Sequence, residues 1–135
     1  MKIFLDINVL VSALSTRGLC ADLMRLVLTE HELCISEQVL VELSRTLNQK
    51  FKLSVQLVGS AIEFLREYQA EASFPVPPIP PIRDTDDERI LRSAVAVGAE
   101  ALVTGDRDLL DVAASVSALR IVSPRGCWEL LRRPA

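Results

Sequence analysis

The sequence predicts a three-layer α/β/α sandwich, in which helices cover both faces of a mainly parallel sheet. Short apolar runs typical of buried strands alternate along the chain with longer segments whose apolar residues recur at helical spacing. Half of the residues are hydrophobic and only 4% are aromatic, so we expect an aliphatic core. Because 135 residues can bury one core of this kind, a single domain is expected over residues 1–135.

The first half of the chain contains two strand-like segments and three helix-like segments. Residues 2–5 are expected to form a short buried strand, and residues 32–35 a second one. Helices are expected over residues 21–29, over residues 36–47 with Ser36 as the N-cap, and over residues 54–71. Apolar residues in the helical segments recur three or four positions apart, so each helix is expected to bury one face.

A proline-rich run at residues 74–82 opens the second half of the chain. Its prolines exclude a helix and a central strand, so we expect an extended connector, with a short edge strand at most. A ligand for a partner that binds proline-rich peptides is the alternative. The remaining elements are expected as a helix from Asp84 to Val97 stopped by Gly98, a strand at 101–104, a helix at 108–115, a strand at 119–122 and a last helix from Pro124.

Four acidic residues border these apolar segments: Asp6, Glu42, Asp87 and Asp106. Asp6 and Asp106 follow strands, whereas Glu42 and Asp87 lie near the starts of helices. Ligands of parallel α/β sheets bind at the carboxyl ends of the strands, so the four side chains are expected in one pocket. Because carboxylates near a core are costly unless they are paired or hold a metal, such a pocket needs a divalent cation.

Asp6 and Glu42 each have a simpler interpretation as well. Asp6 can cap the turn after the first strand together with Asn8. Glu42 flanks the apolar stripe of its helix and can pair within that helix, for example with Arg45 or Thr46. Neither residue alone establishes a metal site.

Asp87 and Asp106 also have simpler interpretations, as an acid in a first helical turn and as a turn residue. Acidic residues in a first helical turn are stabilised by the helix dipole, but Asp87 shares its face with Ile90 and Leu91 and is therefore expected to point inward. Asp106 lies two residues before Asp108. Asp108 is expected to be the N-cap of the following helix, which leaves Asp106 free to bind a metal.

An all-oxygen ligand set of this kind suits Mg²⁺ or Mn²⁺ rather than zinc, and these ions commonly act on phosphates. The three cysteines, Cys20, Cys34 and Cys127, have no zinc spacing and are expected to be reduced in a cytoplasmic protein. No apolar stretch approaches the ~20 residues of a membrane helix. A net charge of −3 gives no overall nucleic-acid signature.

Four segments together resemble the PIN-domain ribonucleases, specifically the small stand-alone toxins of prokaryotic type II toxin–antitoxin pairs. They are FLDINVLVSAL at residues 4–14, ISEQVLVEL at 35–43, RDTDDERIL at 83–91 and LVTGDRDLL at 102–110. No single segment is decisive, but the order and spacing of all four are specific to this family. The resemblance extends from Ile3 to about Trp128.

This resemblance implies an endoribonuclease that uses Mg²⁺ or Mn²⁺, a cognate antitoxin as partner, a homodimer and a five-stranded parallel sheet. It implies metal ligation by Asp6, Glu42, Asp87 and Asp106, with Asn8 and Thr104 as supporting polar groups. Two positions depart from the family pattern: Ile7 stands where the family usually has Thr, and Thr85 where this subgroup often has Pro. Ile7 removes a supporting hydroxyl, which is expected to alter metal affinity.

Two other functions remain open at this point. A phosphatase of the haloacid-dehalogenase type also has an Asp after its first strand, but it needs an acid two residues later, where this chain has Asn8. A non-catalytic α/β module that binds a partner is the other alternative. Five basic residues could guide a phosphate backbone, but each is explained more simply as a solvated charge: Arg17, Arg45, Lys50, Lys52 and Arg107.

Overall fold

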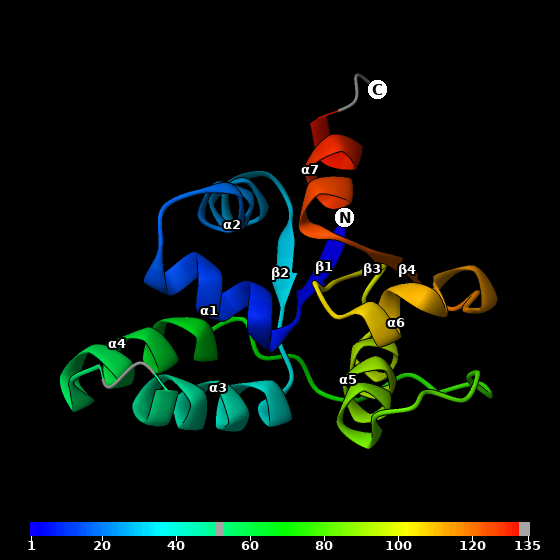
Figure 1. Cartoon of the computed structure of the whole chain (residues 1–135), viewed down its shortest axis with the longest axis horizontal. Helices are drawn as coiled ribbons and strands as arrows, with labels where there is room; N and C mark the ends of the chain where they lie inside the picture. The colour runs from blue at the N-terminus through cyan, green and yellow to red at the C-terminus, as the bar shows by residue number, and fades with distance from the viewer. Residues whose placement is uncertain (51–52, 133–135) are drawn as a thin grey trace.

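The computed structural model describes residues 1–50 and 53–132, so Lys52 and the last three residues of the expected domain lie outside it. The elements are, in chain order, β1 (Lys2–Leu5), α1 (Ile7–Ser15), α2 (Leu19–Glu30), β2 (Glu32–Cys34), α3 (Glu37–Lys50), α4 (Val55–Arg66), α5 (Thr85–Ala96), β3 (Ala101–Val103), α6 (Arg107–Asp111), the 3₁₀ helix η1 (Ala113–Ser115), β4 (Arg120–Val122) and α7 (Pro124–Arg132). Figure 1 shows these elements along the chain.

The strands form one parallel sheet in the order β2-β1-β3-β4. In its centre Phe4 pairs with Cys34 on one side and with Leu102 on the other. Helices flank this sheet (Figure 1), and the predicted α/β class is therefore confirmed. The core is aliphatic as expected, since Phe4 is the only aromatic residue among the largest fully buried side chains of the described residues.

Among the described residues the sheet has four strands, which corrects the five implied by the resemblance. A rudiment of a fifth strand lies beyond β2, where Gln69 forms an isolated parallel bridge with Ile35. The Ile35 amide donates to the Tyr68 carbonyl at 3.1 Å, and the Ala70 amide donates to the Ile35 carbonyl at 2.9 Å. The pairing is not extended, because the Ser73 and Phe74 amides donate to the Ala96 carbonyl of α5 instead, and the proline-rich run begins at Pro75.

Helix α1 is the element that the hydrophobic pattern did not predict. Its consecutive residues Val9, Leu10 and Val11 are all buried in the hydrophobic core, because α1 packs against both α2 and α3. Three consecutive buried residues span more than one side of the helix, and the β-branched residues Val9 and Val11 favour strands, so this run was not recognised as a helix. Tertiary burial therefore decided the conformation here.

The predicted helix starts at Ser36 and Asp84 are confirmed by their capping hydrogen bonds. The Ser36 hydroxyl accepts from the Val39 amide at 3.3 Å, and the Asp84 carboxylate accepts from the Asp86 amide at 2.8 Å. Gly98 follows α5 with a φ of +82°, a conformation that favours glycine at a helix end. Helix α4 ends at Arg66, earlier than expected.

No single helix in the described part of the chain is long and apolar enough to cross a membrane. Helices α1 and α2 meet the length and composition criteria only as a pair bent by 102°, and both contribute buried residues to the core. Helix α2 also packs against α7, and α3 packs against α4 (Figure 1).

Candidate active site

The site lies where the order of the strands reverses. From β1 the chain passes to β2 on one side and later to β3 on the other, which opens a crevice at the carboxyl ends of β1 and β3. Buried polar residues gather there, since Asp6 directly follows β1, Thr104 follows β3, and Asp87 lies on α5. The Asp6 amide donates to the Val103 carbonyl at 2.9 Å, which fixes the two strand ends to each other.

Asp6 is 5% exposed and caps α1, as its simpler interpretation required. Its Oδ1 accepts a hydrogen bond from the Ile7 amide at 2.7 Å, and its Oδ2 accepts from the Thr104 hydroxyl at 2.7 Å and from Asn8 Nδ2 at 3.3 Å. Burial raises the pKa of Asp6, while the bonds from Thr104 and Ile7 act in the opposite direction. Because each carboxylate oxygen has two lone pairs, capping leaves Asp6 able to bind a cation.

Asn8 and Thr104 connect the two loops that carry the acids. Asn8 Oδ1 accepts from the Gly105 amide at 3.1 Å, and the Thr104 hydroxyl oxygen accepts from the Asp106 amide at 3.0 Å. Since both side chains also donate to Asp6, they hold Asp6 and the start of α6 in one arrangement.

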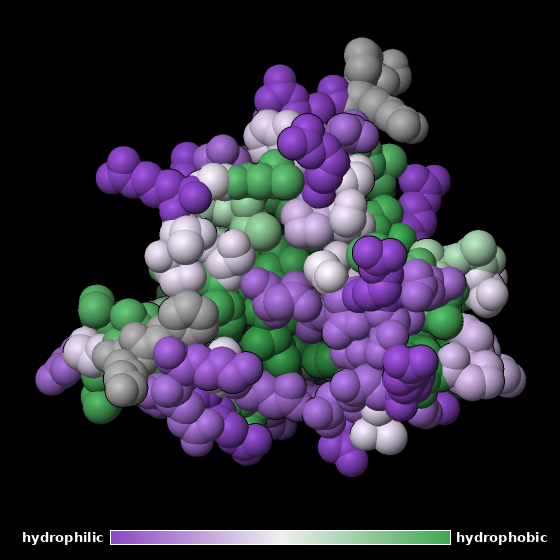
Figure 2. Space-filling view, in the orientation of Figure 1, coloured by the Kyte–Doolittle hydropathy of each residue, from purple (hydrophilic) through white to green (hydrophobic). Residues whose placement is uncertain are grey.

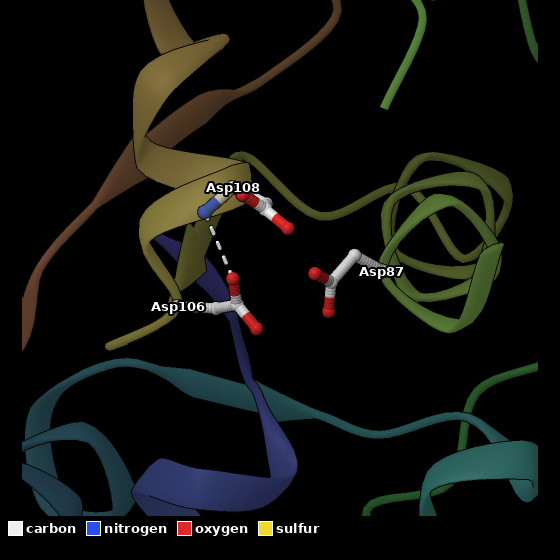
Figure 3. A group of neighbouring side chains, drawn as sticks. All are labelled: Asp87, Asp106 and Asp108. Carbon is white, nitrogen blue, oxygen red and sulfur yellow. Dashed lines mark hydrogen bonds between the residues drawn. The ribbon is translucent and has the colours of Figure 1, made fainter. Parts of the chain in front are cut away.

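Asp106, not Asp108, is the N-cap of α6, which corrects the sequence prediction. Its Oδ1 accepts from the Asp108 amide at 2.9 Å, because the turn held by Thr104 lets the helix begin at Arg107. Figure 3 shows the second oxygen of Asp106 free of this bond, on the side of Asp87. Capping and metal binding are therefore compatible in Asp106, as they are in Asp6.

Asp87 is 8% exposed and points from α5 toward Asp106 and Asp108 (Figure 3). One oxygen from each of these three residues lies within 4.8 Å of the others. Asp87 Oδ2 is buried and has no hydrogen-bond partner among the described residues. Burial, followed by the neighbouring Asp106 carboxylate, raises the pKa of Asp87 to about 7. Sequence reasoning treated Asp108 only as a cap, because its approach to Asp87 depends on how α5 meets α6.

Glu42 is half-buried on α3 and accepts a hydrogen bond from Gln38 Nε2 at 3.3 Å. Glu42 therefore pairs within its own helix, as its simpler interpretation proposed, but the partner is Gln38; among the described residues no hydrogen bond or ion pair joins Glu42 to Arg45 or Thr46. Asp86 also reaches the site, but it is exposed and lies 3.8 Å from Arg89 in an ion pair.

A cavity of about 540 Å³ brings together the four acids singled out by the sequence. It is lined by Asp6, Ile7, Asn8, Val11, Ser12, Ser15, Thr16, Glu42, Thr46, Lys50, Asp86, Asp87, Ile90 and Asp106. Figure 2 shows the hollow between α1, α3 and α5, with apolar surface at its bottom and hydrophilic surface around it. Asp108 does not line this cavity, but its carboxylate groups with those of Asp87 and Asp106, so the structure adds it as a candidate ligand beside the cavity.

The residues present fit a divalent cation. Their donors are carboxylate oxygens, which suit Mg²⁺ or Mn²⁺. The buried Asp87 oxygen without a partner and the raised pKa of its carboxyl group are the signs of a site whose charge is not balanced by the protein alone. A cation would supply that balance.

The stability of the metal-free protein is expected to fall as the pH rises from about 4 to about 7. Because the pKa of Asp87 is raised from 3.8 to about 7, the folded protein holds a proton in this range that the unfolded chain has released. The free energy of unfolding then decreases with pH. Urea unfolding in chelator at several pH values in this range measures the free energy of unfolding. Asp87→Asn should make this free energy less dependent on pH. An equal pH dependence in the variant and the wild type would contradict the raised pKa of Asp87.

The chain is similar to a known protein family and to a solved structure. Residues 2–108 match the family model described as PIN domain. No curated protein sequence matches the chain. Among solved structures, the chain is similar to the crystal structure of VapBC2 from Rickettsia felis bound to a DNA fragment from their promoter, with a TM-score of 0.60 and 16% identity over 91% of this chain and 98% of that chain. At this identity the likeness shows the fold.

Proposed function

Because the chain belongs to the PIN domain family, we propose that it is a metal-dependent endoribonuclease that hydrolyses RNA phosphodiester bonds. PIN domains are generally nucleases, and the acidic cavity at the switch point of the sheet supports this activity here. The single observation that carries the proposal is the buried Asp87 oxygen without a partner, in a cluster made only of carboxylates. Residues 1–135 are proposed to form one nuclease domain.

We assign Asp6, Glu42, Asp87 and Asp106 as the residues that hold Mg²⁺ or Mn²⁺, with Asp108 as an additional candidate. A bound cation of this kind lowers the pKa of a water ligand and neutralises charge on a phosphate undergoing in-line displacement. The protein contributes fixed carboxylates, because Asp6 and Asp106 are held by capping bonds and by Thr104.

The two departures from the family pattern fit the fold. Thr85 is the first residue of α5, a position where proline is favoured because its amide needs no helical partner, and most other residues are tolerated. Ile7 lines the cavity beside Asp6 and offers an apolar wall in place of a hydroxyl. Thr104 and Asn8 remain to orient Asp6 through their own hydrogen bonds.

The biological role that we propose is that of the toxin in a toxin–antitoxin pair, acting in the cytoplasm, with a cognate antitoxin as partner and a homodimer as the assembly. Four sequence segments and the similarity to the VapBC2 structure support this role. A phosphatase of the haloacid-dehalogenase type is disfavoured, because Asn8 occupies the position of the required acid and is engaged with Asp6 and Gly105.

The ends of the cleaved RNA test the proposed reaction. Attack by a metal-activated water is expected to leave a 5′-phosphate and a 3′-hydroxyl, and chelation with EDTA is expected to stop cleavage of single-stranded RNA. Attack by the 2′-hydroxyl of the RNA instead leaves a 2′,3′-cyclic phosphate. End-group analysis by mass spectrometry distinguishes them; cyclic ends, or full activity in EDTA, would overturn the mechanism, and no cleavage with either metal would favour a non-catalytic module.

A further inference from the structure

The cavity continues beyond the acids into a half with different chemistry. This far half is lined by hydroxyl groups and one cation: Ser12 and Ser15 from α1, Thr16 just after it, and Thr46 and Lys50 from α3. Metal binding by the acids does not require this extension. It therefore needs an explanation of its own.

Three lining residues of α3 mark the axis of the cavity. Glu42, Thr46 and Lys50 are four residues apart, so they follow one another along one face of the helix. At 1.5 Å per residue, Lys50 lies about 12 Å along the helix from Glu42, a distance on the scale of a nucleotide or two. Helix α1 runs beside α3 in the same direction, away from the end of β1 (Figure 1). The lining thus changes from acidic to basic along one line.

Lys50 is exposed and forms no ion pair with any other described residue. The ion pairs of the described residues all use arginines, namely Arg25, Arg66, Arg89 and Arg92, and none includes Lys50. A strand whose scissile phosphate lay at the acids would need a cation for its neighbouring phosphate if it followed the cavity. The ammonium group of Lys50 is the cation that the cavity wall provides for it.

The hydroxyl groups of the far half suit a sugar. Ser15 Oγ donates to the Val11 carbonyl at 2.6 Å, and Thr16 Oγ1 donates to the Ser12 carbonyl at 2.8 Å. Their hydrogens are already used, so these oxygens act as acceptors toward a ligand. A ribose hydroxyl or a base amino group supplies the matching donor.

We propose that the far half of the cavity is a subsite for the nucleotide adjoining the scissile phosphate, in which Lys50 binds the next phosphate of the strand. This inference rests on the proposed nuclease function. It makes Lys50 a binding residue whose loss weakens association with RNA and leaves the chemistry at the acids unchanged.

The test compares Lys50→Gln with Arg45→Gln, which removes the same charge from an exposed position of α3 outside the cavity. Two substrates are cleaved with Mn²⁺: a single-stranded RNA of about ten nucleotides, and bis(p-nitrophenyl) phosphate, which has no second phosphate. Lys50→Gln is expected to raise KM for the RNA about fivefold at about 0.1 M salt, with kcat unchanged. The salt dependence of log KM should weaken by about 0.7, the value for one contact with a single strand. The small substrate should not respond.

The outcomes separate the subsite from the nuclease function. A KM and a salt slope that are equal in Lys50→Gln, Arg45→Gln and wild type would overturn the subsite while the nuclease function stands. An equal loss in both variants would show a diffuse charge effect, which also overturns it. Failure of the wild type to cleave either substrate would instead refute the nuclease function, and fluorescence anisotropy of labelled RNA with the same variants would then test the subsite alone.

Discussion

Replacing Asp87 by asparagine is expected to abolish phosphodiester cleavage while the protein remains folded. Asp87 supplies the buried oxygen without a hydrogen-bond partner, and its carboxylate lies within 4.8 Å of those of Asp106 and Asp108. Mutation of a residue that only hydrogen-bonds to a metal ligand lowers metal affinity or activity roughly 10- to 100-fold, and loss of the ligand itself is expected to lower activity further. RNA cleavage with Mn²⁺ or Mg²⁺ measures the loss. Circular dichroism checks the fold.

The same variant is expected to be more stable than the wild type in chelator, because it removes a carboxylate from a site that raises its pKa through burial and through Asp106. Added Mn²⁺ should stabilise the wild type, since the ion binds the folded form, and should have little effect on Asp87→Asn. The matched control is Glu88→Gln, the next residue of α5, which pairs with Arg92 and lies outside the cavity. Full activity in Asp87→Asn would remove Asp87 from the site, and loss of activity in Glu88→Gln would show that the effect is not specific to Asp87.

The helical spacing of the sequence was sufficient to predict that Asp87 points inward. Its face of α5 carries Ile90, Leu91 and Ala94, and all four residues are buried. Strand ends were nearly as accessible to prediction: the first apolar run stops at Asp6 as expected, and β3 ends at Val103, one residue before the expected Thr104. These features are local, because the period of the pattern fixes which side chains share a face.

Other features depend on contacts that no local pattern contains. Helix α1 buries three consecutive residues because it packs against both α2 and α3, and its β-branched valines favour strands. Asp106 caps α6 because Thr104 shapes the turn before it, and Asp108 joins the acids only because α5 meets α6. A fifth strand does not extend from the single bridge beside β2, because the amides of Ser73 and Phe74 donate to the Ala96 carbonyl instead. In each case tertiary packing selected among locally reasonable conformations.

Two substitutions at Asp106 are expected to separate its capping role from its proposed metal-binding role. Asparagine caps helices about as well as aspartate, so Asp106→Asn should keep the hydrogen bond to the Asp108 amide and lose only the charge. Alanine removes both and should cost about 1 kcal/mol of the free energy of unfolding. Cleavage is expected to be lost to the same extent in both variants. Urea unfolding in chelator and RNA cleavage with Mn²⁺ provide the two measurements.

Charge is the property that these variants isolate, because the Asp106 carboxylate faces Asp87 through the oxygen that is not used for capping. Asp111→Asn is the matched control, since this exposed acid lies on the same helix and outside the cavity. It should retain both cleavage and stability. If Asp106→Asn cleaved RNA as well as the wild type while Asp106→Ala did not, the cap alone would matter. The cation would then have to be held without Asp106, by Asp6, Glu42 and Asp87 together with Asp108.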